Sequence, residues 1–289
     1  MANKPVVVGV DGSEESLLAA EWAAMEARRH GLPLRIVSAP ALVPRMRAYQ
    51  SAPATVADAL RGVSEHALER AAERTEEVAP GLEVTTGLLS GSPALAVAGS
   101  GSDAALLVVG ARGAGGFATM ILGSVSRYAA ARATCPVIVV RQATMAVHGE
   151  VAVGIRDPEE ASVALTFAFE EAAARQADLV VVHAWSWYPS ALRGAGGQDM
   201  LDARSHPEQV REEAARVLAA TVEQWREKYP DVRVQHDVIH GHPARVLANY
   251  SPRADLVVIG RHSDPGIGSI QHALLDHARG PVAVVPVGG

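Results

Sequence analysis

Short runs of apolar residues recur along the chain, and longer stretches with helical periodicity separate them. The runs "PVVVGV" (from Pro5), "LRIVSA" (from Leu34), "AALLVVGA" (from Ala104) and "PVIVV" (from Pro136) are almost continuously hydrophobic, which is typical of strands buried on both faces. A further strand is expected at "LEVTTGLLS", from Leu82. Strands that alternate with helices pair in parallel through right-handed crossovers, so this pattern predicts an α/β fold, an open sandwich with a five-stranded parallel sheet.

Turn and capping residues mark the ends of the predicted helices. The sequence "DGS" after the first strand supplies turn and N-cap chemistry, and Gly31 suits the left-handed residue that follows a helix. A proline-rich loop follows the second strand, and an amphipathic helix then runs through about Val78. Pro93 begins a short helix, and a further helix starts near Ser124.

The chain repeats itself with an offset of 145 residues between Val6 and Val151. "VVVGVDGSEESLLAAEWAAMEA" begins at the first of these positions, and "VAVGIRDPEEASVALTFAFEEA" begins at the second. Three later pairs keep the same order: "GSPALAVA" with "GHPARVLA", "AALLVVG" with "ADLVVIG", and "CPVIVV" with "GPVAVV". We therefore expect two tandem Rossmann-like sandwiches, the first over residues 1–143 and the second over residues 149–289.

Composition narrows the class of protein. The chain has 289 residues, of which 48% are hydrophobic and 20% charged, and its formal net charge is −6. This acidic balance argues against a broad nucleic-acid surface, and no window reaches the ~18 apolar residues that a membrane span needs. The single cysteine, Cys135, excludes an internal disulfide and suits a reducing compartment. We expect a cytoplasmic protein that contacts neither nucleic acid nor membrane, with Cys135 buried and inert.

A glycine-rich loop, from Gly110 to Gly123, follows the fourth predicted strand and leads into a helix. In open α/β sheets, ligands bind beyond the carboxyl ends of the strands, and glycines let the backbone approach a ligand closely. Free N–H groups at a helix start favour an anion, so the phosphates of a nucleotide are the expected ligand. Neither common phosphate loop fits, because the chain has no Gly-Lys-Ser or Gly-Lys-Thr and no dinucleotide fingerprint after the first strand.

The spacing of the glycines fits a third pattern. Gly110, Gly113 and Gly123 with Ser124 match the G-2x-G-9x-G-[ST] signature of ATP-binding universal stress proteins. The chain resembles that family also in "VVVGVDGS", "LLVVGARG" and "GSVSRYAAARATCPVIVV". With both repeats the resemblance covers nearly the whole chain, as in tandem members of the family.

The resemblance implies that the first half binds ATP, accompanied by Mg²⁺, with no metal ligand assigned to the protein itself. Asp11 would lie near the ribose and phosphates, Ala39 at the end of the second strand would contact adenine, and the loop glycines would admit the phosphates. The residues that the resemblance implicates in nucleotide binding are Gly9, Val10, Asp11, Ser13, Ala39, Val109, Gly110, Arg112, Gly113, Gly115, Gly123, Ser124, Val125 and Ser126.

Structural roles stay open for several of these residues. Asp11 could cap the first helix, a role that is compatible with ligand binding, and Ser124 could act only as an N-cap. Arg112 is expected to be a solvated loop charge as much as a phosphate ligand. The glycines have no good structural alternative, because a glycine-rich loop is costly to order without a reason.

The second half departs from the pattern where a nucleotide would bind. Arg156 stands where the first half has Asp11, and the loop from Gly260 to Gly268 spans eight positions where its counterpart spans 13. We therefore expect this half to bind ATP weakly or not at all. A different anion stays open as its ligand, because Arg156 and Arg261 lie in this region.

Catalysis finds little support in the sequence. There is no Ser-His-Asp order or paired-carboxylate spacing, and the close histidine pair, His240 and His242, does not make a metal site. The resemblance implies a nucleotide-responsive stress or dormancy factor rather than an enzyme; a slow ATP-hydrolysing enzyme and a nucleotide-free scaffold remain alternatives. In this family the last strands pair, so the two halves are expected to form a pseudo-dimer. Tandem chains are then expected to form homodimers, and an unidentified protein partner stays open.

Overall fold

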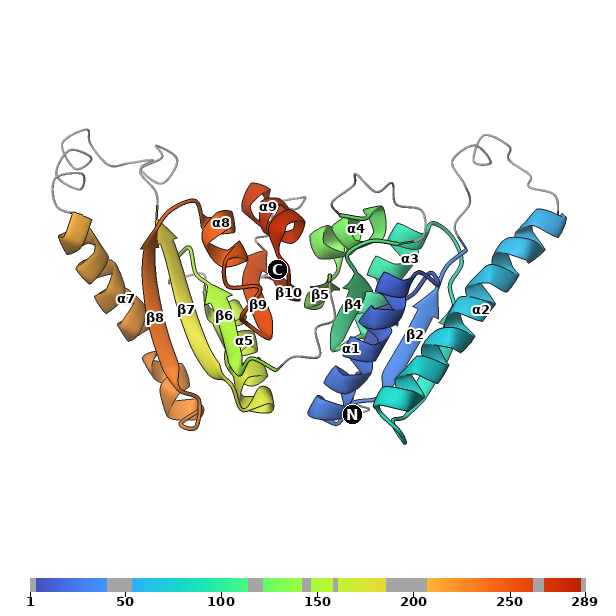
Figure 1. The fold of residues 1–289 in the computed structure, drawn as a ribbon, viewed down its shortest axis with the longest axis horizontal. Helices are drawn as coiled ribbons and strands as arrows, with labels where there is room; N and C mark the ends of the chain where they lie inside the picture. The colour runs from blue at the N-terminus through green and yellow to red at the C-terminus, as the bar shows by residue number, and fades with distance from the viewer. Residues whose placement is uncertain are drawn as a thin grey trace.

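The computed structural model describes residues 4–40, 54–113, 122–141, 147–157, 161–185, 207–261 and 268–286. The described residues of the first half form five strands, four α-helices and one 3-10 turn (Figure 1). In chain order these elements are β1 (Val6–Gly9), α1 (Glu14–His30), β2 (Leu34–Ser38), α2 (Ala54–Val78), β3 (Val84–Leu88), α3 (Pro93–Gly99), η1 (Ser100–Asp103), β4 (Leu106–Gly110), α4 (Ser124–Arg132) and β5 (Val137–Val140).

The second half repeats this order of strands and helices. Its described elements are β6 (Glu150–Gly154), α5 (Ser162–Arg175), β7 (Asp178–Trp185), α7 (Pro207–Lys228), β8 (Val234–His240), α8 (Pro243–Ala248), β9 (Leu256–Arg261), α9 (Ser269–His277) and β10 (Val282–Pro286).

The ten described strands join one sheet in the order β3-β2-β1-β4-β5-β10-β9-β6-β7-β8. Neighbouring strands run parallel within each half, and the central pair β5–β10 runs antiparallel, with Ile138 opposite Ala283. Figure 1 shows the halves on either side of this pair, with α2 and α7 outermost. The structure confirms the expected five-stranded parallel sheets and their pairing through the last strands.

Local capping explains the ends of α1, the helix that follows the first strand. Ser13 has an extended backbone, and its side chain accepts a hydrogen bond from the backbone N–H of Ser16, so it acts as the N-cap. Gly31 ends the helix with a left-handed φ of 62°, a conformation that glycine adopts without steric cost. Both ends agree with the sequence expectation.

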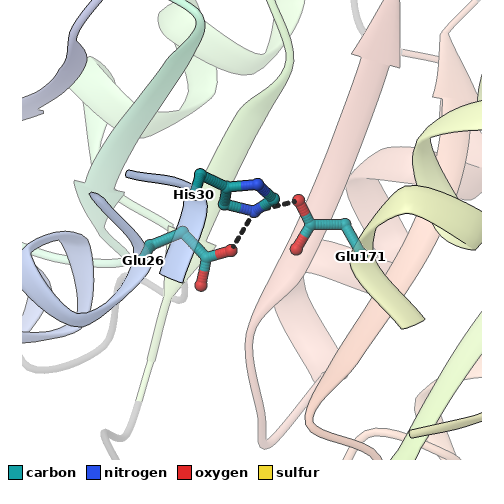
Figure 2. A group of neighbouring side chains, drawn as sticks. All are labelled: Glu26, His30 and Glu171. Atoms are coloured by element: carbon teal, nitrogen blue, oxygen red, sulfur yellow. Dashed lines mark hydrogen bonds and ion pairs between the residues drawn. The ribbon is translucent and has the colours of Figure 1, made fainter. Parts of the chain in front are cut away.

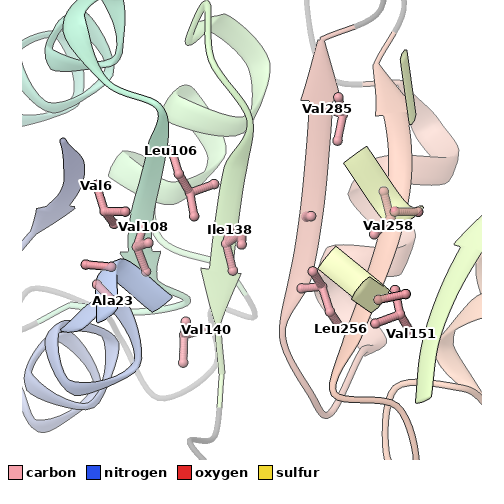
Figure 3. Packing of buried hydrophobic residues seen from close by; sticks show 14 of the residues in the cluster. Val6, Ala23, Leu106, Val108, Ile138, Val140, Val151, Leu256, Val258 and Val285 are labelled. Carbon is pink, nitrogen blue, oxygen red and sulfur yellow. The ribbon is translucent and has the colours of Figure 1, made fainter. Parts of the chain in front are cut away.

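The two faces of the sheet carry separate hydrophobic clusters, because successive strand residues point to opposite faces. One cluster joins Val8 and Ile36 to α1, α2, α5 and α7, and the other joins Val7 and Val37 to α3, α4, α8 and α9. Figure 3 shows members of the first cluster from both halves. Each cluster therefore runs across the junction and helps to hold the halves together.

A buried group of charges lies where α1 and α5 pack together (Figure 2). The Nε2 atom of His30 lies 2.9 Å from Oε1 of Glu26 and 3.1 Å from Oε1 of Glu171. Arg175 donates to Oε2 of Glu26 at 2.8 Å and also pairs with Glu171. The two glutamates are equivalent positions of the repeat, as are His30 and Arg175, so this charged cluster straddles the local two-fold axis.

Candidate functional site

The carboxyl ends of β1 and β4 lie side by side, with Gly9 opposite Val109. The chain leaves β1 towards β2 and leaves β4 towards β5, so the strand order reverses at this point, which is where open α/β sheets bind ligands. Val10 continues β1 by donating its N–H to Val37 O at 2.9 Å, and Asp11 follows at the edge of the sheet. The fold thus places the predicted nucleotide residues at the topological switch point of the first half.

Asp11 is held in place by the start of α1. Its Oδ1 atom accepts hydrogen bonds from the backbone N–H of Ser13 at 3.1 Å and from the hydroxyl of Ser13 at 2.6 Å. Its own N–H donates to the Ser16 hydroxyl oxygen at 3.2 Å. Asp11 is exposed, so these bonds orient a carboxylate that still faces solvent. Ser13 therefore acts on the site through Asp11 and through the helix cap.

Two positions of the loop require glycine because neighbouring atoms lie too close to leave room for a Cβ atom. A Cβ atom at Gly113 would collide with Oδ2 of Asp11, so the loop backbone lies directly against that carboxylate. A Cβ atom at Gly110 would lie 2.9 Å from the backbone oxygen of Glu15, closer than real contacts allow. These contacts bring the start of the glycine loop and the end of β1 together.

The start of α4 offers backbone donors at the same edge. Gly123 is the N-cap, and its own N–H donates to Ala111 O at 2.8 Å, which ties the helix start to the end of β4. The first N–H groups of a helix have no acceptor within the helix, and here they belong to Ser124, Val125 and Ser126. Such a helix start suits an anion.

The hydroxyl of Ser126 has a structural role that the sequence expectation does not include. It is buried and donates to Gly110 O at 2.6 Å, so its proton is not directed at a ligand. The second half keeps this bond with another residue, because Gln271 Nε2 donates to Gly260 O at 3.0 Å. A bond from the first helical turn to the preceding strand is therefore common to both halves, and Ser126 contributes to the site through its backbone N–H.

The remaining predicted residues divide into backbone positions and loop positions. Val10 and Val109 are buried in the sheet, so only their backbone can reach a ligand. Ala39 is partly exposed just after β2, as contact with a planar base requires. Arg112 is exposed, and Gly115 lies outside the described residues.

A cavity of about 630 Å³ lies at the junction of the halves and shares Ala111 and Arg112 with the glycine loop. It is lined by side chains of both charge signs from α1, the ends of β4 and β5, and the segment after α9, and neither Asp11 nor Ser124 is among its lining residues. Its lining residues are Glu14, Glu15, Leu18, Ala111, Arg112, Arg141, Ala278 and Arg279.

The equivalent edge of the second half is built differently. The side chain of Gln271 folds over Gly268, where a Cβ atom would collide with its carboxamide, so it covers the start of α9. His183, on β7, has its Nδ1 atom 3.1 Å from Ile155 O, and the ring of Trp185 packs 4.6 Å from that of His240. Among the described residues, the side chains at this edge are thus larger than those at the equivalent edge of the first half.

The charged cluster of Glu26, His30, Glu171 and Arg175 was missed by sequence reasoning. The carboxylate and imidazole atoms of Glu26, His30 and Glu171 lie within 4.8 Å of one another, close enough for a metal ion. Arg175 pairs with both carboxylates and Arg29 pairs with Glu26, so the cluster is satisfied as an ion-pair network. Hydrogen bonds to Glu171 and Glu26 raise the pKa of His30 to about 9 against the opposing effect of burial, which makes it a further cation at neutral pH beside the two arginines.

Cys135 lies just before β5 and is buried. Burial raises the pKa of its thiol to about 11, so the thiolate is scarce at neutral pH. This agrees with the expected inert thiol. Among the residues that the structure describes, no helix has the length and apolar character needed to cross a membrane.

Comparisons with known proteins agree with this architecture. The model of the universal stress protein family matches residues 2–141 and 149–286. Universal stress protein Rv2005c of Mycobacterium tuberculosis (strain ATCC 25618 / H37Rv) is 35% identical over 293 residues, which cover 96% of each chain. A universal stress protein of Mycolicibacterium smegmatis is 31% identical over 299 residues, covering 97% of this chain and 96% of the relative.

The fold has a close counterpart among solved structures. The crystal structure of a universal stress protein from Archaeoglobus fulgidus DSM 4304 covers 98% of this chain and 96% of its own, with a TM-score of 0.70 and 18% sequence identity. That likeness shows the tandem α/β fold, and the family model covers both halves. The chain therefore belongs to the universal stress protein family, as a tandem member with two such domains.

Proposed function

We propose that the first half binds ATP and that the chain works as a nucleotide-responsive stress or dormancy factor. The observation that carries this proposal is the close approach of Gly113 to Asp11, beside the start of α4. It joins a carboxylate, a glycine backbone and free helix N–H groups at one switch point, which is where open α/β sheets bind nucleotides.

Each part of ATP has residues at this site that suit it chemically. The N–H groups of Ser124, Val125 and Ser126 suit phosphate oxygens, and the glycines leave room for the phosphates to approach the backbone. Asp11 suits ribose hydroxyls, and Ala39 suits the adenine. Mg²⁺ would arrive with the triphosphate, whose oxygens supply much of its coordination shell.

The second half is proposed not to bind ATP. Gln271 covers the start of α9, and Arg156 replaces the carboxylate that follows the first strand. We propose one nucleotide per chain, bound by the first half.

The chain is proposed to be a binding protein rather than an enzyme. Asp11 is the acidic side chain at the described site, and its Oδ1 atom accepts hydrogen bonds from Ser13. We propose that Asp11 orients the nucleotide rather than acting as a general base, because its Oδ1 atom already accepts two hydrogen bonds. Steady ATP turnover that Asp11→Ala abolishes would favour the enzyme alternative.

The proposal is tested by calorimetric titration of the full chain with ATP and Mg²⁺. Gly123 has φ −69° and ψ 158°, which any residue adopts, but a Cβ atom there would lie 3.3 Å from Ala111 O at the helix start. A side chain at this helix start would block the approach of the phosphates, so Gly123→Val should remove ATP binding and keep the fold. The matched control is Gly268→Val at the equivalent position of the second half, where the atoms nearest to an added Cβ belong to the flexible side chain of Gln271.

The expected result is one site in the wild type, none in Gly123→Val and one in Gly268→Val. Two equivalent sites, or loss of binding in Gly268→Val, would contradict the assignment to the first half. No binding by the wild type would favour the nucleotide-free scaffold. The physiological role is tested by stress survival of cells whose only copy carries Gly123→Val, which should match cells without the protein.

A further inference from the structure

Arg261 reaches from the second half to the first. It is the last residue of β9, and its guanidinium donates to Ala131 O at 2.7 Å through Nη1 and to Ala133 O at 2.6 Å through Nη2. These carbonyls lie at the C-terminal end of α4, which ends at Arg132 with Ala133 as its C-cap. The forked guanidinium thus satisfies two carbonyls at one helix end.

A cation at this end matches the polarity of the helix. The last carbonyls of a helix have no donor within it, and the helix dipole places partial negative charge there. The opposite end of the same dipole is positive and lies at Ser124, where the phosphates are proposed to bind. Arg261 and a bound phosphate would therefore each place a favourable charge at one end of the α4 dipole.

Because α4 is short, a movement of its C-terminal end also moves its N-terminal end. The helix has nine residues, which corresponds to about 13 Å. Its start is fixed to β4 by the bond from the Ser126 hydroxyl to Gly110 O and by the bond from Gly123 N to Ala111 O. Its end is fixed by Arg261 to the other half. A shift at the end changes where the N–H groups of the first turn point.

We propose that Arg261 is a positioning residue for the nucleotide site: the second half holds α4 so that its first N–H groups face the phosphates. This inference rests on the proposed ATP binding by the first half. It gives the second half a function in nucleotide binding although its own edge is covered by Gln271.

A coupling of this kind acts in both directions. If the contact of Arg261 with α4 favours ATP binding, bound ATP must strengthen that contact by the same free energy. ATP should then slow amide hydrogen exchange in the second half, at the end of β9 and at its neighbour β10. If Arg261 only stabilised the packing of the two halves, ATP would not change amide exchange in β9 and β10.

The experiment uses the full chain with Arg261→Ala, Arg261→Lys and a matched control, Arg233→Ala. Arg233 also lies in the second half, and its side chain is 78% exposed and 3.6 Å from Asp178. ATP affinity is measured by calorimetry, and amide exchange is followed with and without ATP in residues 122–133, 256–261 and 282–286. Circular dichroism and thermal melting check that each variant is folded.

Arg261→Ala should raise the Kd for ATP about fivefold or more, the lower range of typical coupling between sites. It should also speed exchange in residues 122–133 and abolish the ATP-dependent protection of residues 256–261. Arg261→Lys should fall between this variant and the wild type, because an ammonium group cannot span both carbonyls as the guanidinium does. Arg233→Ala should behave like the wild type.

The outcomes separate the two proposals. If the wild type binds no ATP, the proposed function fails and this inference fails with it. If the wild type binds ATP and folded Arg261→Ala binds it equally well, the inference alone is overturned. If Arg261→Ala does not fold, Arg261→Lys decides: unchanged affinity and unchanged ATP-dependent protection would overturn the inference.

Discussion

Glu26 and Glu171 occupy equivalent positions of the two repeats, and both share a single imidazole nitrogen, Nε2 of His30. The counterpart of this histidine in the second half is Arg175, which pairs with the same two carboxylates. The two buried carboxyl groups therefore face two permanent cations, Arg175 and Arg29, and one titratable cation, His30. Burial raises the pKa of Glu171. The junction of the halves should consequently be sensitive to pH.

The first prediction concerns the protonation of His30. Hydrogen bonds to Glu171 and Glu26 raise its pKa from 6.5 to about 9. Because the pKa is higher in the folded state, the stabilisation is present in full below about pH 6.5 and is lost as the pH rises through about 9. The groups that face His30 are Glu26 and Arg29 on its own helix, and Glu171 and Arg175 on α5.

Urea unfolding at several pH values between 6 and 10 checks this prediction. The free energy of unfolding should fall by about 1–3 kcal/mol over this range, and His30→Gln should remove most of that fall. His66→Gln is the control, because His66 lies on α2 with 71% of its side chain exposed. An equal pH dependence in the wild type and in His30→Gln would contradict the role given to this histidine.

The contact between Gly113 and Asp11 predicts a non-additive pair of substitutions. Gly113→Ala puts a methyl group against the Asp11 carboxylate, so it should displace that group and weaken ATP binding about tenfold, or about 1.4 kcal/mol. Asp11→Ala should weaken binding on its own. Calorimetry on the double variant should then show less than the sum of the two losses, because the collision is gone. Strictly additive losses would mean that the two residues act separately.

The hydroxyl of Ser126 is predicted to contribute to stability more than to ligand binding. Ser126→Ala leaves Gly110 O without its donor, which should lower the free energy of unfolding by about 1–2 kcal/mol. The Kd for ATP should change less than threefold, about 0.6 kcal/mol, since the backbone N–H of residue 126 remains and the bond from Gly123 N to Ala111 O still fixes the helix start. Gln271→Ala is the matched variant, because it removes the same bond in the second half. A large loss of ATP affinity without a loss of stability would restore the hydroxyl as a phosphate donor.

The reactivity of Cys135 is predicted to report on local unfolding at the start of β5. Its thiol is buried and its pKa is raised to about 11, so alkylation by iodoacetamide at pH 8 should be slow in the native chain. In urea the same thiol should react at the rate of a free cysteine peptide. The ratio of the two rates, followed by mass spectrometry, measures how often this region opens. Rapid alkylation of the native protein would show that the strand end is open in solution.

The parts of the fold that depend on local pattern could be predicted from the sequence. Continuous apolar runs gave the strands, and the left-handed Gly31 gave the end of α1, because each signal is contained in a few neighbouring residues. The spacing of Gly110, Gly113 and Gly123 located the candidate site, and the contact of Gly113 with Asp11 is the kind of close approach that such glycines allow.

The parts that depend on side chains far apart in the sequence could not be predicted. The repeat and the pairing of the last strands imply a local two-fold axis, but the positions that meet at it depend on the rotation of α1 and α5. Glu26 and Glu171 therefore look like ordinary helix residues in the sequence. The resemblance implied that Ser126 contacts phosphate, whereas its hydroxyl donates to Gly110 O, a bond that cannot be read from the motif.

The bonds from Arg261 to the end of α4 depend on the two domains having different sequences. Because Gly260 corresponds to Gly110, Arg261 corresponds to Ala111, a small buried residue inside the glycine loop of the first half. In an assembly of two identical chains, any arginine added at this position to hold the partner's helix would also appear in the loop that has to admit a ligand. A single chain with two different halves does not have this constraint, because its two equivalent positions can carry different residues. One copy can keep the small residue, while the other carries the long cation.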